Sequence, residues 1–216
     1  FNDLGKQYDI AINGYAPKRY PCGGVIHTAI DAALTVRDRL GADVANIASI
    51  HAGIARYAAD RAKPEYPANT EAAKFNLQYV VGYSLARGVP KLAAFDPPAI
   101  ADPAVKAMAQ KVTASIDPEF ADARQNYPTR LKVTLKDGRT LTKRVADFKG
   151  TPESPLTPAE MREKFMMITS HCDPKAMGRL FDRIQTIERE KTLDWLKVPA
   201  ASKRNAANKS AKKKKR

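Results

Sequence analysis

Residues 130–145, RLKVTLKDGRTLTKRV, decide that this chain contains a β-sheet. Leu131, Val133 and Leu135 are apolar at every second position, which is the period of a strand that buries one face. Asp137-Gly138 follows and predicts a tight primed turn into a second strand. The stretch is therefore expected to form a β-hairpin.

The sequence on both sides of this hairpin carries further strand and helix patterns. The β-branched run VANIASIHAGI, residues 44–54, predicts another strand. Capping residues, terminal glycines and helical spacing predict five helices, over residues 25–40, 69–88, 102–112, 157–168 and 173–190. The expected fold class is α+β, with an antiparallel hairpin-containing sheet and packed helices, followed by purely helical residues after the turn-rich segment KGTPESPL.

The net charge of +14 is concentrated at the C-terminal end. Residues 199–216 hold eight Lys or Arg and no acid, while residues 1–198 hold 29 basic and 23 acidic side chains. A tail of this composition cannot bury a core, so we expect it to be disordered and solvated. Nucleic-acid binding through phosphate contacts is the secondary alternative, because no aromatic residue is interleaved with the charge.

Other features of the sequence restrict the class of protein. No apolar run reaches the length of a membrane span, and the N-terminus does not resemble a signal peptide. Cys22 and Cys172 lie far apart and do not make a disulfide framework, so a reduced, cytoplasmic setting is expected. The chain begins without Met, and we expect it to be a fragment of a longer protein.

The stretch KRYPCGGVIHTAID, residues 18–31, gathers several chemically capable side chains in front of the first predicted helix. Cys22 and His27 lack the second ligand pair that a structural zinc site shows, so no metal site is expected. A cysteine nucleophile would need a base and an oxyanion hole, and neither is evident from the sequence.

An anion-binding turn fits this stretch better. Gly23 and Gly24 precede a helix whose first N–H groups and positive dipole end attract a carboxylate or phosphate. Lys18 and Arg19 add positive charge, and the dipole is expected to keep His27 neutral and able to act as a base. A plain turn before a core helix remains the structural alternative.

Five segments of the chain resemble the MmgE/PrpD family in their order and spacing. They are KRYPCGGVIHTAIDAALTVR, TEAAKFNLQYVVGYSLARG, DPAVKAM, VTLKDGRTL and the pattern G.PE.PLT..E...KF. The family includes 2-methylcitrate dehydratases, cis-aconitate decarboxylases and iminodisuccinate epimerases. The resemblance covers residues 14–196 and corresponds to the C-terminal half of the family's proteins.

The resemblance implies a domain organisation. Residues 14–148 would form a smaller α+β lid domain, and residues 149–196 would be C-terminal helices that belong to a large all-α domain. Residues 1–13 would be the end of a preceding helical domain or a linker, and residues 197–216 the basic tail. The implied partners are the missing N-terminal helical half and a second copy in a homodimer.

The resemblance also implies a function. It predicts a lyase or isomerase that acts on a small polycarboxylate, without a metal or organic cofactor, by removing a proton next to a carboxylate. We expect a carbon–oxygen lyase similar to 2-methylcitrate dehydratase, with decarboxylation and epimerisation left open. The alternative is a noncatalytic module derived from the family, whose Lys-rich tail binds nucleic acid or another acidic partner.

Site residues follow from matching positions. Lys18 corresponds to the family's basic residue before its Tyr/Phe-Pro pair, and His27 to the histidine that closes the motif. Lys18, Arg19 and the amides of Gly23 and Gly24 would bind the substrate carboxylate. His27 would be a general acid or base, or a hydrogen-bond donor to a carboxylate.

Tyr57, in IARYAADR, lies near a substrate-facing tyrosine of the decarboxylase branch and is a further catalytic candidate. The chain also departs from the family pattern. Relatives carry another histidine or charged residue between the positions of Pro21 and His27, where this chain has only Cys22, glycines and aliphatic residues. The reaction subtype therefore stays open, as does a homologue that has lost its pocket.

Overall fold

The computed structural model describes residues 5–6, 8, 10, 14–61, 65–124 and 126–196. The chain forms two compact units, Phe1–His171 and Cys172–Arg216. The expected basic tail and most of the N-terminal segment lie outside the described residues. Within the described ranges, no helix combines the length and apolar character needed to cross a membrane.

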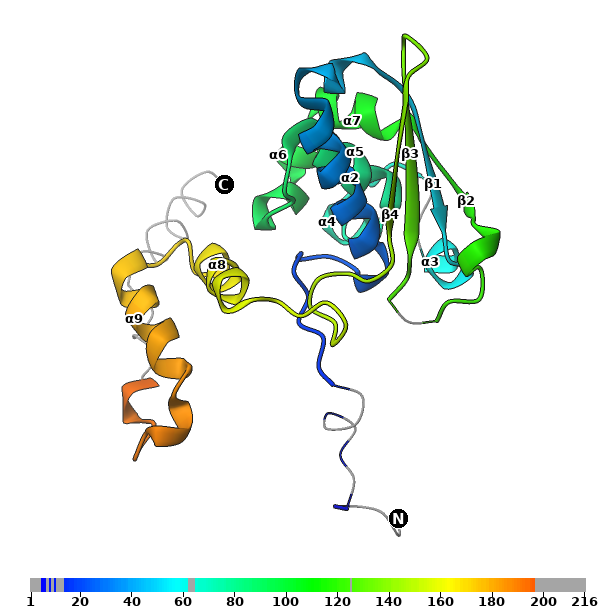
Figure 1. Ribbon diagram of the computed structural model, residues 1–216. Coiled ribbons are helices and arrows are strands. Elements are labelled where there is room, and N and C mark those ends of the chain that lie inside the picture. Colours follow the sequence, from blue (N-terminus) through cyan, green and yellow to red (C-terminus); the bar gives the residue numbers. More distant parts are fainter. Residues whose placement is uncertain are drawn as a thin grey trace, which may run out of the picture. The chain divides into compact units, whose positions relative to one another are not determined.

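A four-stranded mixed sheet in the order β2-β1-β3-β4 forms one side of the first unit (Figure 1). Its strands are β1 (Ile47–Ile54), β2 (Val112–Ile116), β3 (Thr129–Leu135) and β4 (Thr140–Val145). The β3–β4 and β1–β3 pairs are antiparallel, as expected, but β1 and β2 are parallel. In β3, Leu131, Val133 and Leu135 are buried, so the period of two is confirmed.

Two sequence-based expectations for the sheet were wrong. Val112 was assigned to the end of a helix, and strand β2 was not predicted, because its residues are exposed after Val112 and give no apolar alternation. The hairpin turn is not a two-residue primed turn. The N–H of Gly138 donates to Leu135 and that of Leu135 to Arg139, and Gly138 has a φ of +88°, which makes a three-residue loop with a G1 bulge.

Helices cover one face of this sheet (Figure 1). Helix α2 (His27–Leu40) packs on β3 and β4, α5 (Leu77–Arg87) packs on α2 and β2, and α7 (Pro103–Ala109) packs on α5. The shorter elements are η1 (Gly24–Ile26), η2 (Gly41–Asn46), α3 (Arg56–Arg61), α4 (Thr70–Ala73), η3 (Leu92–Phe95), α6 (Pro97–Ile100) and η4 (Pro118–Phe120). The core lies between the helices and the sheet, with Ile30, Tyr79 and Leu131 fully buried.

The helix expected over residues 69–88 is broken in two. Asn69 caps α4 as predicted, but a second cap, Asn76, accepts from the N–H of Tyr79 at 2.7 Å and starts α5. The amide of Asn76 also donates to the carbonyl of Glu65, and its side chain is fully buried. An asparagine with two local backbone partners therefore outweighs the continuous helical pattern.

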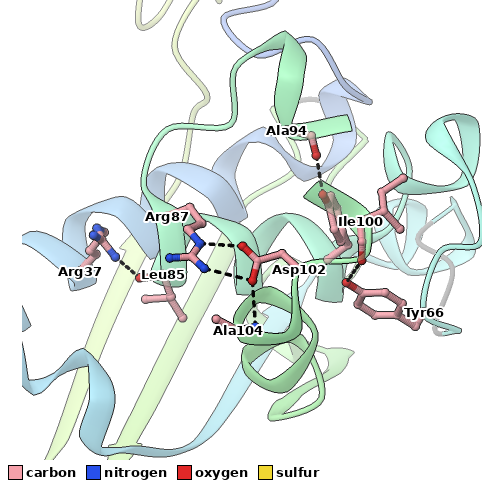
Figure 2. Close-up of polar contacts among 9 residues, drawn as sticks. Arg37, Tyr66, Leu85, Arg87, Ala94, Ile100, Asp102 and Ala104 are labelled. Carbon is pink, nitrogen blue, oxygen red and sulfur yellow. Dashed lines mark hydrogen bonds and ion pairs between the residues drawn. The ribbon is translucent and has the colours of Figure 1, made fainter. Parts of the chain in front are cut away.

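Polar contacts fix the outer helices of the first unit (Figure 2). Asp102 caps α7 by accepting from the N–H of Ala104 at 2.9 Å, as predicted, and pairs with Arg87 at the end of α5 through two hydrogen bonds of 2.7 and 3.0 Å. The Tyr66 hydroxyl donates to the carbonyl of Ile100 at 2.8 Å. These contacts join the end of α5 to the start of α7, and the loop before α4 to α6.

The remaining helices are α8 (Pro158–Ile168) in the first unit and α9 (Pro174–Ile184), η5 (Ile187–Arg189) and η6 (Asp194–Leu196) in the second. The predicted capping box of α8 is present, since Thr157 accepts from the N–H of Glu160 and Glu160 accepts from that of Thr157. The assignment of residues 149–196 to a separate all-α domain concerns a longer protein and stays a prediction.

Candidate active site

The segment from Lys18 to Gly24 runs into helix α2 through η1 and is tied to the fold at Gly23. The N–H of Gly23 donates to the carbonyl of Lys74 at 2.8 Å, where the break between α4 and α5 leaves that carbonyl available. A Cβ at this position would lie 2.9 Å from Cδ1 of Phe75, so any larger residue would require the Phe75 side chain to move. The sequence-based role of Gly23 as a carboxylate donor is therefore corrected, because its N–H is already used.

Gly24 is the glycine that the structure leaves open to a ligand. Its N–H makes no hydrogen bond to another described residue, and it is only partly buried. A Cβ at Gly24 would lie 4.0 Å from Cε of Lys18, so the exposed lysine side chain runs over this glycine. The Lys18 side chain therefore passes close to Gly24 just before α2, and the binding of a carboxylate at these two residues stays a prediction.

Tyr20 holds this segment against α2. It is buried, and its hydroxyl donates to Oδ1 of Asp31 at 2.6 Å. Burial raises the pKa of the Tyr20 hydroxyl well above its usual value and also raises the pKa of Asp31. The segment therefore has two anchors, one on the helix through Tyr20 and one on the α4–α5 connection through Gly23.

His27 lies fully buried behind the segment. Its ring makes edge contacts with Tyr20 and Phe148, at centroid distances of 5.2 and 5.4 Å. Neither ring nitrogen has a hydrogen-bond partner among the described residues. Burial and the positive charge of Lys18 lower the pKa of His27 to about 4, so the ring is neutral at pH 7. Neutrality agrees with the expectation, although burial rather than the helix dipole is the main cause.

A cavity of about 430 Å³ lies beside this segment. Its walls come from the segment itself, from the α4–α5 connection and from α8. Its charged lining residues are Lys18, Arg19, Lys74, Lys164 and Glu71. Four cations against one acid make this an electropositive cavity of a size that suits a small anionic ligand.

Arg19 lines the cavity and also forms an ion pair with helix α8. Its guanidinium pairs with Glu160 at 3.3 Å, and Lys149 lies 3.8 Å from the same carboxylate. Hydrogen bonds from Thr157 and these cations hold the pKa of Glu160 below its usual value. The contacts fasten the start of α8 to the Lys18 segment and reduce the part that Arg19 can take in binding an anion.

Tyr57 does not line the cavity of Lys18. It lines a separate cavity of about 270 Å³ and stacks on Tyr127, with ring centroids 5.1 Å apart. Tyr127 and the preceding Asn126 have φ values of +43° and +62°, a conformation that is strained for a tyrosine. The Tyr127 carbonyl accepts from the hydroxyl of Thr28, which is next to His27. The structure therefore places Tyr57 near the start of α2 but not beside Lys18.

Sequence reasoning missed Lys74, Lys164 and Tyr127. The two lysines come from helical stretches that carried no motif for anion binding, and they join Lys18 only in the folded chain. The only earlier signal for Lys164 is its place in the pattern that ends in KF. A tyrosine with positive φ has no sequence signature.

Cys22, which precedes His27 by five residues in the sequence, has a packing role. Cys22 is buried, and burial raises the pKa of its thiol to about 12, so it is a poor nucleophile at neutral pH. His51, on β1, lies 2.9 Å from the Ser115 hydroxyl on the exposed face of the sheet. Among the described residues, no three His, Cys, Asp or Glu side chains come together as metal ligands.

Comparison with known proteins supports the resemblance seen in the sequence. The profile of the MmgE/PrpD C-terminal domain matches residues 20–187. Human cis-aconitate decarboxylase is 29% identical over 164 residues, which cover 74% of this chain and 33% of that protein. The mouse cis-aconitate decarboxylase is 29% identical over 100 residues, 46% of this chain and 20% of that protein. The chain thus spans about a third of the length of the human relative, and it belongs to the MmgE/PrpD family.

Proposed function

We propose that this chain is the C-terminal part of a lyase that acts on a small polycarboxylate. The observation that carries the proposal is the Lys18 side chain, which lines an electropositive cavity and passes with its Cε 4.0 Å from the Cβ position of Gly24, in η1 just before α2. A lysine and a free backbone N–H together provide the charge and the hydrogen bond that a carboxylate accepts. The family and its cis-aconitate decarboxylase members support this substrate class.

The proposed reaction begins with removal of a proton from the carbon next to a carboxylate. In a dehydration of the 2-methylcitrate type, that proton and a hydroxide from the neighbouring carbon leave as water, and a C=C bond forms. Negative charge builds on the carboxylate as the C–H bond breaks, and Lys18 with the Gly24 N–H stabilises it. We propose that the reaction needs no metal or organic cofactor, as the family resemblance implies.

His27 is the proposed general acid or base on this side of the site. Its ring is neutral at pH 7, and neither nitrogen makes a well-formed hydrogen bond to a described residue, although backbone groups of Cys22 and Tyr20 act on the ring and partly oppose the lowering of its pKa. Because the ring is fully buried behind Tyr20, contact with a substrate requires the Lys18 segment to shift. Tyr57 remains a weaker candidate for a second acid, since it lines another cavity.

Decarboxylation of a cis-aconitate-like substrate is the second candidate reaction, favoured by the two curated relatives. It shares the need for a cation at the carboxylate that carries developing charge. We propose further that a helical segment outside this chain supplies the other catalytic groups, and that the protein is a cytoplasmic homodimer. These points rest on the family resemblance.

The test is a substrate panel on the full-length protein that contains this chain. 2-Methylcitrate, cis-aconitate and iminodisuccinate are offered to the wild type, to Lys18→Gln and to Lys175→Gln, a control on the exposed start of α9. Lys18→Gln is expected to lower kcat/KM by about 100-fold or more, the usual effect of losing one charge-stabilising group. Turnover of none of the three, or an unchanged kcat/KM in Lys18→Gln, would contradict the proposal.

The alternative, a noncatalytic module that binds nucleic acid through its tail, is tested separately. Removing residues 199–216 is expected to leave turnover unchanged. Loss of RNA binding with a steep salt dependence, in a protein that turns over no polycarboxylate, would favour the alternative.

A further inference from the structure

The four cations of the 430 Å³ cavity differ in whether a carboxylate already neutralises them. Arg19 is paired with Glu160, and Lys74 is paired with Glu71 at 2.8 Å. Lys18 and Lys164 have no ion-pair partner within the described part of the chain. Two uncompensated positive charges therefore remain on different walls of one cavity.

Lys164 is held in place by the contacts of its helix. The capping box at Thr157 fixes the first turn of α8, and Glu160, one turn before Lys164, is bound to Arg19 and Lys149. Lys164 is itself partly buried, and burial lowers the pKa of its amine. Its charge also helps to lower the pKa of His27, so Lys164 acts on the same region as Lys18.

Lys18 and Lys164 each carry a positive charge that no carboxylate of the described residues neutralises, and partial burial adds a desolvation cost at Lys164. A ligand with one carboxylate can neutralise only one of these two lysines. A ligand with two or more carboxylates, spaced across the cavity, relieves both and gains a charge-assisted hydrogen bond at each end. The cavity is therefore built for an anion that carries more than one carboxylate.

We propose that Lys164 binds a second carboxylate of the substrate from helix α8, and that it contributes to the preference for polycarboxylates. The inference rests on the proposed function, in which Lys18 binds the first carboxylate. It assigns a specificity role to a helix that lies far from the Lys18 motif in the sequence.

The experiment measures binding of propane-1,2,3-tricarboxylate to the full-length protein that contains this chain, by calorimetry or NMR. The variants are Lys18→Gln, Lys164→Gln, Lys164→Arg and Lys91→Gln. Lys91 is the matched control, because it lines a small neighbouring pocket together with Lys164 but does not line this cavity. Unfolding midpoints of all variants establish that each one is folded.

Lys164→Gln is expected to weaken binding by about tenfold or more, the loss of one charge-assisted hydrogen bond. Lys164→Arg should restore most of the affinity, and Lys91→Gln should stay within twofold of the wild type. If Lys18→Gln weakens binding but Lys164→Gln behaves like Lys91→Gln, the inference is overturned while the proposed function stands. If the wild type does not bind the tricarboxylate, or neither lysine matters, both are overturned.

Discussion

The burial of His27 predicts that this chain loses stability in acid for a specific reason. The folded imidazole has a pKa of about 4, against the ordinary pKa of 6.5 that applies to the unfolded chain. Keeping the ring neutral contributes fully to the free energy of unfolding above pH 6.5. This contribution is lost as the pH falls toward 4, because the unfolded chain then binds a proton that the folded chain does not. The difference between the two pKa values corresponds to about 3 kcal/mol of unfolding free energy.

The assay compares urea unfolding of the wild type and of His27→Leu between pH 7.5 and 4.5. At pH 7.5 the variant is expected to be as stable as the wild type or more so, because it removes two buried ring nitrogens without described partners. As the pH falls, the wild type should lose about 2–3 kcal/mol more than the variant. The raised pKa of Asp31 acts in the opposite direction, and it is common to both proteins, so the difference isolates His27.

A parallel loss of stability in both proteins would refute the reasoning. So would an imidazole titration by NMR that places the His27 midpoint at 6.5 or above. Either result would mean that the ring reaches water or an acidic partner in the folded chain. The proposed role of His27 as a neutral group at pH 7 would then lose its basis.

Three further predictions concern the helices around the site. Gly82→Ala should lower the free energy of unfolding by about 2 kcal/mol, because the added Cβ would lie 2.6–2.8 Å from atoms of Ala109 and the gain in helix propensity is only about 1 kcal/mol. Ser84→Ala on the same helix is the control for urea unfolding and should be near neutral, because it removes a buried hydroxyl that has no hydrogen-bond partner among the described residues. Asp102→Ala should lower the free energy of unfolding by about 1–2 kcal/mol, because it removes the cap of α7. Asp102→Asn keeps this cap and loses only the exposed ion pair with Arg87, so it should lower the free energy of unfolding by about 0.5 kcal/mol or less. Equal losses in the two variants would show that the ion pair dominates. Thr157→Ala removes the capping box of α8, so it should lower the free energy of unfolding by about 1 kcal/mol and weaken tricarboxylate binding. Unchanged binding would show that the cap does not position Lys164.

The sequence predicted the parts of the fold that depend on local patterns. The alternation of Leu131, Val133 and Leu135 and the caps at Asp102 and Thr157 act over a few residues, and the structure contains them. The parallel strand β2 could not be predicted in this way, because it is an edge strand held by pairing with β1 and buries little of its own. The G1 bulge depends on the register of two strands, which the Asp137-Gly138 dipeptide does not determine by itself.

The candidate site was predictable only where it is contiguous in the chain. Lys18, Gly24 and His27 lie within ten residues, and their positions before a helix indicated the chemistry. The helix break at Asn76 was not predicted, and it is this break that supplies Lys74 and Phe75 to the cavity and satisfies the N–H of Gly23. Lys164 stands out because two other cations of the cavity, Arg19 and Lys74, are neutralised by ion pairs. These ion pairs form only in the folded chain, so the sequence does not show them.

The central claim is that a carboxylate binds at Lys18 and the N–H of Gly24. The most direct measurement follows the backbone amide resonances of Gly23 and Gly24 in the full-length protein that contains this chain, during titration with propane-1,2,3-tricarboxylate. We predict a saturable shift of the Gly24 amide that is lost in Lys18→Gln, and a much smaller shift of the Gly23 amide, whose N–H stays bonded to Lys74. A Gly24 amide that does not move, or that moves equally in Lys18→Gln, would contradict the claim.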